Sequence, residues 1–216
     1  MKPHFLLTIA LCSLIVMSCS RRSTSSLTTP PIEEAKTTSF SKDQLQLIQA
    51  GTASDPMRLF LTSNSKDSLL LRKRAAEVIA NPEDPTLNIF IDRLLTTVQD
   101  SLSLGVGIAA PQVGVLKRII WVQRFDKEGF PFEVYLNPVI KQYTKKKQNC
   151  MEGCLSIPNK QAETKVRAYA ILLEYDTREG EHITEMVEDF TAVIFQHEID
   201  HLNGILFTDL LSEEKG

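Results

Sequence analysis

Two histidines four residues apart, His197 and His201, flank Glu198, and this pattern constrains the fold of the chain more than any other. Apolar residues before the pair recur at helical spacing, so a helix is predicted over Phe190–Asn203, ended by Gly204. Residues i and i+4 lie about 40° apart around a helix, so both imidazoles can reach one metal ion. Glu198 then lies beside that ion, where it can take a proton from water. The fold must therefore turn this helix face inward.

A site of this kind needs a further protein ligand, and the residues after the motif limit where it can come from. One branch of metalloproteases uses a histidine just beyond the glycine, but Phe207 stands at that position here. A second branch uses a glutamate much further downstream, whereas Glu213 and Glu214 follow closely in a polar tail. The third ligand should therefore come from upstream. Cys154 is the best candidate, because thiolates bind zinc and ferrous iron strongly.

The composition is that of an ordinary globular protein. The chain has 216 residues, 43% of them hydrophobic and 24% charged, with a formal net charge of −3. The length suits one domain with appendages, and the charge lacks the basic excess of a dedicated nucleic-acid binder. Four cysteines are too few for a disulfide scaffold of this length. The composition also excludes a mostly disordered, a collagen-like or a multi-span membrane chain.

The N-terminus has the pattern of an export signal. Phe5–Met17 is apolar but shorter than the ~20 residues that span a bilayer, as expected for a signal-peptide core. Ser18 before Cys19 resembles the lipobox of bacterial lipoproteins, in which the cysteine is lipidated. An uncleaved N-terminal anchor and a misassigned start codon are the alternatives. We therefore expect a signal peptide at 1–18, a flexible Ser/Thr/Pro-rich tether at 19–39 and a globular domain at 40–216.

The globular part mixes helical and strand patterns. Apolar residues from Thr86 to Val98 recur every three or four positions, which predicts an amphipathic helix. Leu45–Ile48 and Met57–Leu61 are short apolar pieces that indicate early turns and a strand. Since strands precede one late helix, we predict an α+β fold of short antiparallel strands packed around the helix with the HExxH motif. The predicted strands are Ile119–Val122, Phe132–Leu136 ended by Asn137-Pro138, and a hairpin of Ala170–Tyr175 with Glu181–Val187.

Three segments together resemble the signature motifs of the peptide deformylase family, in the family's order. They are Gly105–Gln112 (GVGIAAPQ), Glu152–Ser156 (EGCLS) and Gln196–Gly204 (QHEIDHLNG). The resemblance extends over Leu45–Leu211, nearly the whole globular part. The glycine-rich segment lacks the Lys-Ser/Thr of a P-loop and the rest of a dinucleotide fingerprint. We interpret it as a loop whose backbone approaches the substrate closely.

The resemblance implies a metal-dependent hydrolase that removes the N-formyl group from N-formylmethionyl peptides or proteins and releases formate. It implies that Cys154, His197 and His201 hold one divalent ion, which is usually Fe²⁺ in bacterial members, with Zn²⁺ as the alternative. Glu198 would accept a proton from water and deliver it to the leaving amine.

The resemblance also implies which residues contact the substrate. The oxyanion of the intermediate would be stabilised by the Gln112 side-chain amide and the Leu155 backbone N–H. Val106 and Gly107 would pair with the substrate backbone as a strand. The methionine pocket is expected to be lined by Phe190, Val193 and Ile194.

We expect no direct catalytic role for several other polar residues. Arg167 is expected either to pair with Asp200 or Glu152 or to be a surface strand arginine. Cys150 could form a redox pair with the nearby Cys154, but we interpret it as a passenger thiol. We further expect Gln196 to brace the motif, and Lys145–Lys147 and His182 to be exposed.

Export and deformylation conflict, because nascent chains are deformylated at the ribosome, in the cytoplasm. Either the true start lies later and the enzyme is cytoplasmic, or an exported enzyme acts on formyl peptides or other small amides outside. A third reading is an idle metal- or peptide-binding lipoprotein, which the intact Glu198 and Gln112 argue against. The missing downstream ligand argues against a general metalloprotease. The expected partners are formyl-Met peptides or protein N-termini and, through lipid on Cys19, a membrane, with no nucleic acid and a monomeric state.

Overall fold

The computed structural model describes residues 40–100 and 105–213, and the fold is α+β, as predicted. The predicted signal peptide, the lipobox at Cys19 and the tether lie outside the described residues. The helices are α1 (Lys42–Gln49), α2 (Ser65–Leu71), α3 (Pro85–Gln99), the 3-10 turn η1 (Ala110–Val113), α4 (Asp189–Leu202) and α5 (Phe207–Glu213). The strands are β1 (Gly107–Ala109), β2 (Ile119–Gln123), β3 (Phe132–Tyr143), β4 (Lys147–Cys154), β5 (Ile157–Ala168), β6 (Ala170–Asp176) and β7 (His182–Glu188).

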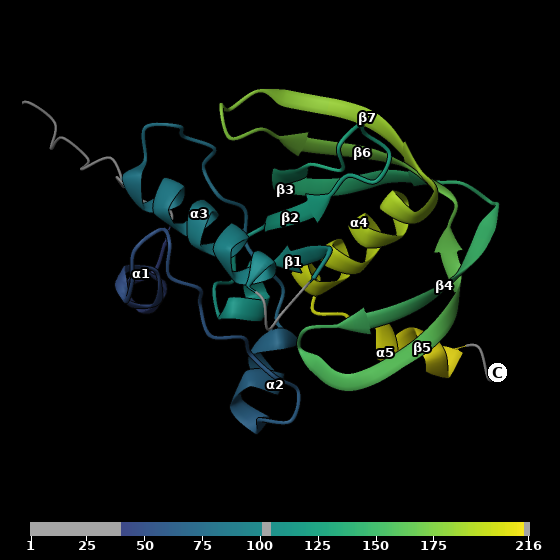
Figure 1. Ribbon diagram of the computed structural model, residues 1–216, viewed down its shortest axis with the longest axis horizontal. Coiled ribbons are helices and arrows are strands. Elements are labelled where there is room, and N and C mark those ends of the chain that lie inside the picture. The colour runs from purple at the N-terminus through teal and green to yellow at the C-terminus, as the bar shows by residue number, and fades with distance from the viewer. Residues whose placement is uncertain (1–39, 101–104, 214–216) are drawn as a thin grey trace, which may run out of the picture. The chain divides into compact units, whose positions relative to one another are not determined.

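Five of these strands form one antiparallel sheet in the order β1-β2-β3-β6-β7, while β4 and β5 pair with each other in a separate hairpin. Figure 1 shows α4 running between the large sheet and the β4–β5 hairpin, with α3 beside β1 and β2. The helix with the HExxH motif is therefore enclosed by two β structures.

Strand β2 is buried on both faces, which explains its continuous apolar sequence. Ile119 and Trp121 belong to the core that includes α3, and the Trp121 indole donates to the Ile91 carbonyl at 2.9 Å. Ile120 and Val122 belong to the second core, which includes α4. Successive side chains of a strand point to opposite faces, so α3 and α4 cover opposite faces of the sheet.

The start of α3 follows the local sequence. The Asp84 side chain caps the helix by accepting from the backbone N–H groups of Thr86 and Leu87 at 2.8 and 3.2 Å, and Pro85 occupies the first turn. The periodicity from Thr86 to Val98 therefore predicted this helix well. Its inward residues, such as Phe90 and Leu94, are fully buried.

The expectation for the first apolar pieces was wrong. Leu45–Ile48 belongs to α1, which begins with a capping box between Ser41 and Gln44, a signal that the sequence does contain. Met57–Leu61 forms no strand. The Phe60 N–H instead donates to the Gln112 carbonyl at 2.7 Å, so this segment forms a backbone hydrogen bond with η1.

One strand prediction needs correction, and one pair of strands was missed. Strand β3 does not end at Asn137-Pro138 but continues to Tyr143. Asn137 adopts a positive φ of 52°, and the pairing with β6 shifts register between Leu136 and Val139, so a bulge absorbs the proline. The β4–β5 hairpin was not predicted, because much of it is exposed and polar and it lacks an apolar period.

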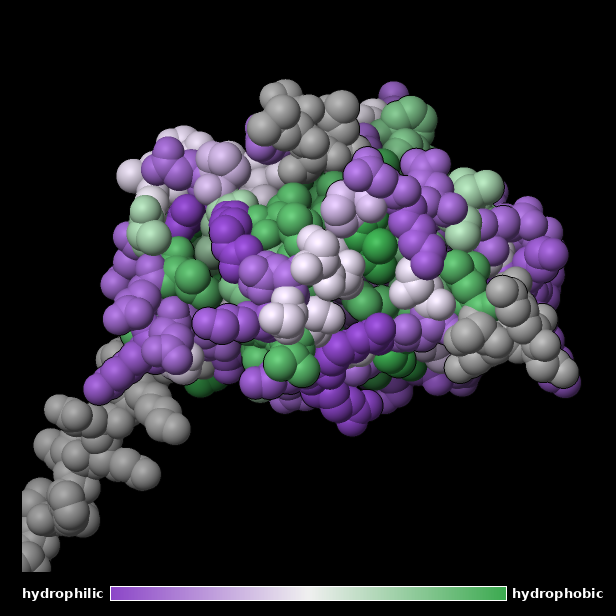
Figure 2. All heavy atoms as spheres, turned by 90° about the horizontal axis from the view of Figure 1, so that it is seen from below, coloured by the Kyte–Doolittle hydropathy of each residue, from purple (hydrophilic) through white to green (hydrophobic). Residues whose placement is uncertain are grey.

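Helix α4 is buried along almost its whole length. A helix covered on all sides belongs to the interior of a domain, which agrees with the inward face predicted for the motif. Figure 2 shows one face of the molecule, on which hydrophobic residues are exposed among hydrophilic ones. Among the described residues, none of the helices combines the length and the apolar character needed to span a membrane.

Candidate metal centre

Helix α4 and strand β4 bring the three predicted ligands together. Sulfur Sγ of Cys154 lies 3.2 Å from Nε2 of His201. Ligand atoms of Cys154, His197 and His201 all lie within 4.8 Å of one another, and both histidines are buried. One sulfur and two imidazole nitrogens at this spacing can surround a single ion.

The polar atoms of this cluster fit a bound metal ion. Nδ1 of His197 is held at 2.7 Å by Oε2 of Glu152, which leaves Nε2 as the nitrogen available to a metal. Oε2 of Glu198 is buried and has no hydrogen-bond partner among the described residues. A buried polar atom without a partner is costly, and an ion with its water would offset that cost. A thiolate and two neutral imidazoles suit Zn²⁺ or Fe²⁺.

The electrostatics of the cluster favour a thiolate. Burial alone would raise the pKa of Cys154, but the adjacent His201 and His197 lower it to about 5. Burial likewise opposes protonation of His197, yet hydrogen bonds with Cys154 and Glu152 raise its pKa. The cluster therefore attracts positive charge, which is the environment that a divalent cation requires.

Glu198 lies beside the cluster in a tight space. Burial raises its pKa to about 7, although His197 and His201 oppose the shift. A Cβ atom on Gly107 would lie 2.5 Å from Oε1 of Glu198 and 2.9 Å from the side chain of Ile194. Only glycine at position 107 therefore leaves room for the carboxyl group.

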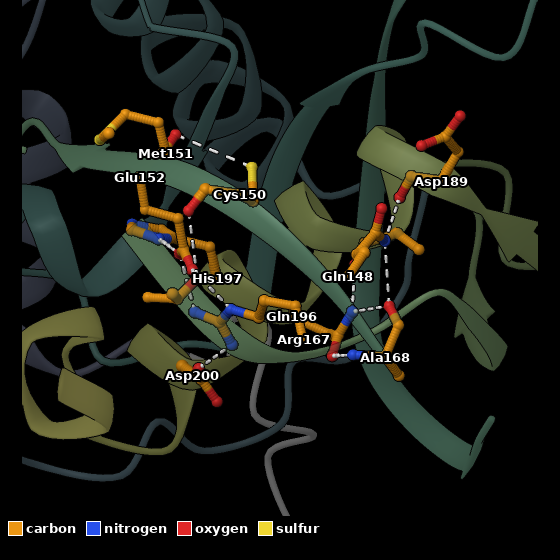
Figure 3. A network of polar contacts seen from close by, with 12 residues as sticks. Gln148, Cys150, Met151, Glu152, Arg167, Ala168, Asp189, Gln196, His197 and Asp200 are labelled. Carbon is orange, nitrogen blue, oxygen red and sulfur yellow. Dashed lines mark hydrogen bonds and ion pairs between the residues drawn. The ribbon is translucent and has the colours of Figure 1, made fainter. Parts of the chain in front are cut away.

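A charged network fixes the orientation of His197 (Figure 3). Arg167 reaches Glu152 through two hydrogen bonds, of 2.8 and 2.9 Å, and Asp200 through a third, of 2.6 Å. Burial would raise the pKa of Glu152, but hydrogen bonds from His197 and Arg167 lower it to about 2. Arg167 thus pairs with both of the acids that were considered for it, and it is not a surface arginine.

Gln112 lies where a donor to the substrate is expected. Its Oε1 accepts from the Ala109 N–H at 2.8 Å, which orients the amide so that Nε2 donates to Ser156 Oγ at 3.3 Å. Nε2 also lies 3.7 Å from the Cys154 sulfur. Ser156 is fully buried and was not predicted as part of the site, although it closes the EGCLS motif.

A pocket of about 830 Å³ opens beside this cluster. His197, Glu198, Cys154, Gln112 and Leu155 border it. The five residues predicted to bind the substrate backbone and the methionine side chain also line it: Val106, Gly107, Phe190, Val193 and Ile194. Sequence reasoning missed the side of the pocket formed by the β4–β5 hairpin, which includes Met151 and Pro158–Gln161. The only signal for it was its position next to the EGCLS motif.

The remaining predictions concern residues around the site. Gln196 braces α4 against β5, because its amide accepts from the Ala168 N–H and donates to the Ala168 carbonyl at 2.9 and 3.0 Å. Cys150 and Cys154 are both free thiols, and Cys150 also borders the pocket. Lys145–Lys147 and His182 are exposed, as predicted.

Comparisons with known proteins all point to one family. The family model described as polypeptide deformylase matches residues 60–216. A peptide deformylase of Desulforudis audaxviator is 41% identical over 142 residues, covering 65% of this chain and 86% of the relative. Peptide deformylase 2 of Clostridium acetobutylicum is 40% identical over 150 residues, covering 69% and 93%.

Solved structures extend the likeness to the fold. The structure of a class I type b peptide deformylase from Acinetobacter baumannii with Met-Ala-Ser bound matches with a TM-score of 0.64 and 33% identity, covering 73% of this chain and 99% of that one. The peptide deformylase of Thermotoga maritima matches with a TM-score of 0.62 and 34% identity, covering 72% and 97%.

Proposed function

The chain belongs to the peptide deformylase family, and from this premise we propose that it hydrolyses the N-formyl group of N-formylmethionyl peptides and releases formate. The observation that carries the proposal is the convergence of Cys154, His197 and His201 beside Glu198, at the wall of a pocket large enough for a peptide side chain. The reaction breaks the amide bond between the formyl carbon and the methionine nitrogen, and water supplies the hydroxyl of formate.

Different residues have different roles in this reaction. A divalent ion held by Cys154, His197 and His201 would supply Lewis-acid activation of water. Glu198 takes a proton from the attacking water and delivers it to the methionine amine as the bond breaks. Its burial supports this role, as does its Oε2, which lacks a hydrogen-bond partner within the described part of the chain, because a carboxyl with a pKa of about 7 exchanges protons readily at neutral pH.

The developing oxyanion needs hydrogen-bond donors aimed at it. The Ala109 N–H orients the Gln112 amide so that its Nε2 lies near the Cys154 sulfur. The Leu155 backbone N–H directly follows Cys154 in the chain. Loss of one such donor typically costs about 3 kcal/mol of transition-state stabilisation. Gln112 and Leu155 are therefore proposed as the oxyanion donors.

The pocket supports a peptide substrate with an apolar first side chain. Val193 and Ile194 supply an apolar wall on α4, and Val106 and Gly107 border the same pocket. Among similar proteins, solved structures hold Met-Ala-Ser in the Acinetobacter baumannii enzyme and actinonin in the Synechococcus elongatus enzyme. We assign Val106 and Gly107 to the substrate backbone and Phe190, Val193 and Ile194 to the methionine pocket.

The metal and the location of the enzyme are further parts of the proposal. The Cys-His-His donor set accepts Fe²⁺ or Zn²⁺, and the likeness to bacterial deformylases favours Fe²⁺. The apolar stretch before Ser18-Cys19 supports lipidation of Cys19, which would place the enzyme on a membrane outside the cytoplasm. Its substrates there would be released formyl peptides rather than nascent chains.

The test compares N-formyl-Met-Ala-Ser with N-acetyl-Met-Ala-Ser on the purified, metal-loaded chain. Formyl carries a hydrogen where acetyl carries a methyl, and the carbonyl must fit between Gln112, the Leu155 amide and the metal. We expect release of formate with little or no release of acetate. Addition of a chelator should abolish the activity, and return of Fe²⁺ or Zn²⁺ should restore it.

Other outcomes would favour the other readings. Bound metal without formate release above background would favour a binding protein over an enzyme. Cleavage of internal peptide bonds would favour a general metalloprotease. Either result would overturn the proposed function.

A further inference from the structure

A second cavity lies at the C-terminal end of α4. It has a volume of about 400 Å³, and none of the described residues that line it borders the larger pocket. Ile199 and Asn203 supply its wall on α4, each two positions after a metal ligand, His197 or His201. Two positions correspond to about 200° around a helix, so the cavity lies on the face of α4 turned away from the candidate metal centre.

The cavity contains two arginines that no carboxylate neutralises. Arg74, after α2, is exposed and Arg118, before β2, is partly buried, and neither forms an ion pair within the described part of the chain. Burial lowers the pKa of Arg118; the charge of Glu77 opposes this shift and that of Arg74 adds to it. Two cations in one cavity repel each other, and an anion bound between them would relieve that repulsion.

Arg118 also has more hydrogen-bond donors than partners. Its Nη1 donates to Oδ1 of Asn203 at 3.1 Å and its Nη2 to the Pro138 carbonyl at 2.7 Å, whereas a guanidinium carries five N–H donors. Its Nε is buried without a partner among the described residues. The other described side-chain atoms in that state, Oε2 of Glu198 and Nδ1 of His201, belong to the candidate metal centre. Each Nη atom retains a second N–H that a ligand can use.

The end of α4 does not require the charge of Arg118. A cation near a helix C-terminus ordinarily compensates carbonyl groups without partners. Here the Asp200 carbonyl accepts from the Ile205 N–H at 2.9 Å. The Leu202 carbonyl accepts from the Ala75 N–H at 2.8 Å. Backbone donors therefore occupy these carbonyls, and the guanidinium charge is available to a ligand.

The lining defines the class of that ligand. The two arginines and the acidic Glu77 give the cavity two positive charges and one negative charge, a net charge of +1. Val139, Ile140 and Ile199 supply apolar walls, and the side chain of Tyr143 is 57% exposed at the cavity. A carboxylate matches both the single charge and the fork of a guanidinium, whereas a phosphate carries close to two negative charges.

From these observations we infer that the cavity between Arg74 and Arg118 is a binding site for a monocarboxylate with a small apolar or aromatic body. The guanidinium groups hold the carboxylate, and the apolar residues of β3 and α4 contact the body. The inference goes beyond the proposed function and does not depend on it, because the two pockets share no lining residue among the described residues.

The experiment is an NMR titration of the Zn²⁺-loaded full chain with benzoate as the probe. Benzamide is the neutral isostere, and inorganic phosphate is the alternative anion. Benzoate should bind saturably with a Kd of about 1 mM, roughly tenfold more tightly than either of the other two. The backbone amides that shift should be those of the cavity, such as Tyr143 and Asn203, rather than those around the metal ligands.

Two variants change the charge of the cavity in opposite directions. Arg74→Gln breaks no hydrogen bond of the described residues and should weaken benzoate binding roughly threefold to tenfold. Glu77→Gln removes the opposing charge and should strengthen it roughly twofold to threefold. The matched control is Lys66→Gln, because Lys66 is an exposed cation on α2 outside the lining, and its Kd should equal that of the wild type.

Several results would overturn the inference. They are absence of saturable benzoate binding, amide shifts confined to the metal centre, and a Kd that neither Arg74→Gln nor Glu77→Gln changes. Benzamide binding as tightly as benzoate would show that the arginines do not hold the carboxylate. Phosphate binding more tightly than benzoate would overturn the assigned ligand class.

Discussion

Glu198 shows how the surroundings of a residue prepare it for chemistry. An exposed glutamate is fully ionised at neutral pH, but burial raises the pKa of Glu198 to about 7. Its Oε2 has no partner among the described residues, and glycine at position 107 leaves space for its Oε1. A general base works best with a pKa near the operating pH, so this carboxyl is well suited to transfer protons.

The first prediction concerns Glu198→Gln. The variant keeps the shape of the side chain but cannot accept a proton, so metal content should stay at the wild-type level while kcat falls roughly 10²- to 10⁴-fold. Metal analysis and turnover of formyl-Met-Ala-Ser on the same sample measure both. Turnover close to that of the wild type would show that Glu198 is not the base.

The second prediction separates two thiols on the same strand. Cys154→Ser should sharply lower the metal content of the purified protein, because a hydroxyl is a much weaker ligand than a thiolate. Cys150→Ser is the matched control and should keep its metal, since Cys150 is absent from the ligand cluster among the described residues. Equal metal loss in both variants would contradict the assignment of Cys154.

At the scale of elements, the site exists because α4 docks against the β4–β5 hairpin. Cys154 ends β4, Glu152 precedes it on the same strand, and Arg167 lies on the pairing strand β5. The bonds from Glu152 to His197 and from Arg167 to Asp200 tie both strands to the helix (Figure 3). The geometry of the metal site therefore depends on this contact between elements.

The third prediction tests that contact. Glu152→Gln weakens the hydrogen bond that orients His197 and leaves Arg167 partly unpaired, so metal affinity should fall about 10- to 100-fold. Competition with a chelator measures the affinity. Glu163 is exposed on β5, so Glu163→Gln is the control, and this variant should bind metal as the wild type does. If both variants bind equally well, the network does not support the site.

The fourth prediction concerns the turn between β2 and β3 at low pH. The hydrogen bond from Arg124 holds the pKa of the Asp126 carboxyl below its usual range. A lowered pKa in the folded state stabilises the protein above the unfolded pKa, and this stability is lost as the pH falls through the folded value. Asp126→Asn should therefore be less stable by about 1 kcal/mol at pH 7, with the difference shrinking below pH ~4. Denaturant unfolding of both chains at a series of pH values measures this, and a constant difference would contradict it.

At the scale of the whole molecule, one sheet separates two cores. The side with α3 supplies a rigid support for β1, and the side with α4 carries the candidate metal centre. The described residues begin at Phe40, and the predicted signal peptide and tether lie outside them. The fifth prediction therefore concerns the full chain in cells.

If Cys19 is lipidated, the protein should fractionate with membranes and carry lipid on that residue. Cys19→Ala should prevent the modification, while Cys12→Ala, within the apolar stretch, is the control and should not. Cell fractionation measures the membrane association, and mass spectrometry of the mature N-terminus detects the lipid on Cys19. Full-length soluble protein that retains Met1 would contradict the export proposal and favour a cytoplasmic enzyme.

Local sequence patterns were enough to predict much of the secondary structure of this protein. The spacing of His197, Glu198 and His201 and the periodicity of Thr86–Val98 each depend on neighbours within a few turns, so both helices could be predicted. The turn residues between β6 and β7 likewise marked their hairpin. For the same reason the proline after Asn137 misled the prediction of β3, because the bulge that absorbs it depends on the pairing with β6.

Only the tertiary structure decided how distant segments meet. Cys154 and His201 are 47 positions apart, and the sequence suggested their meeting only by the exclusion of downstream ligands and by the resemblance to a family. The links from Glu152 to His197, from Arg167 to Asp200 and from Phe125 to Phe190 join different elements and leave no period in the sequence. The physical reason is that burial and charge pairing act between surfaces in space, whereas periodicity records only which face of its own element a residue occupies.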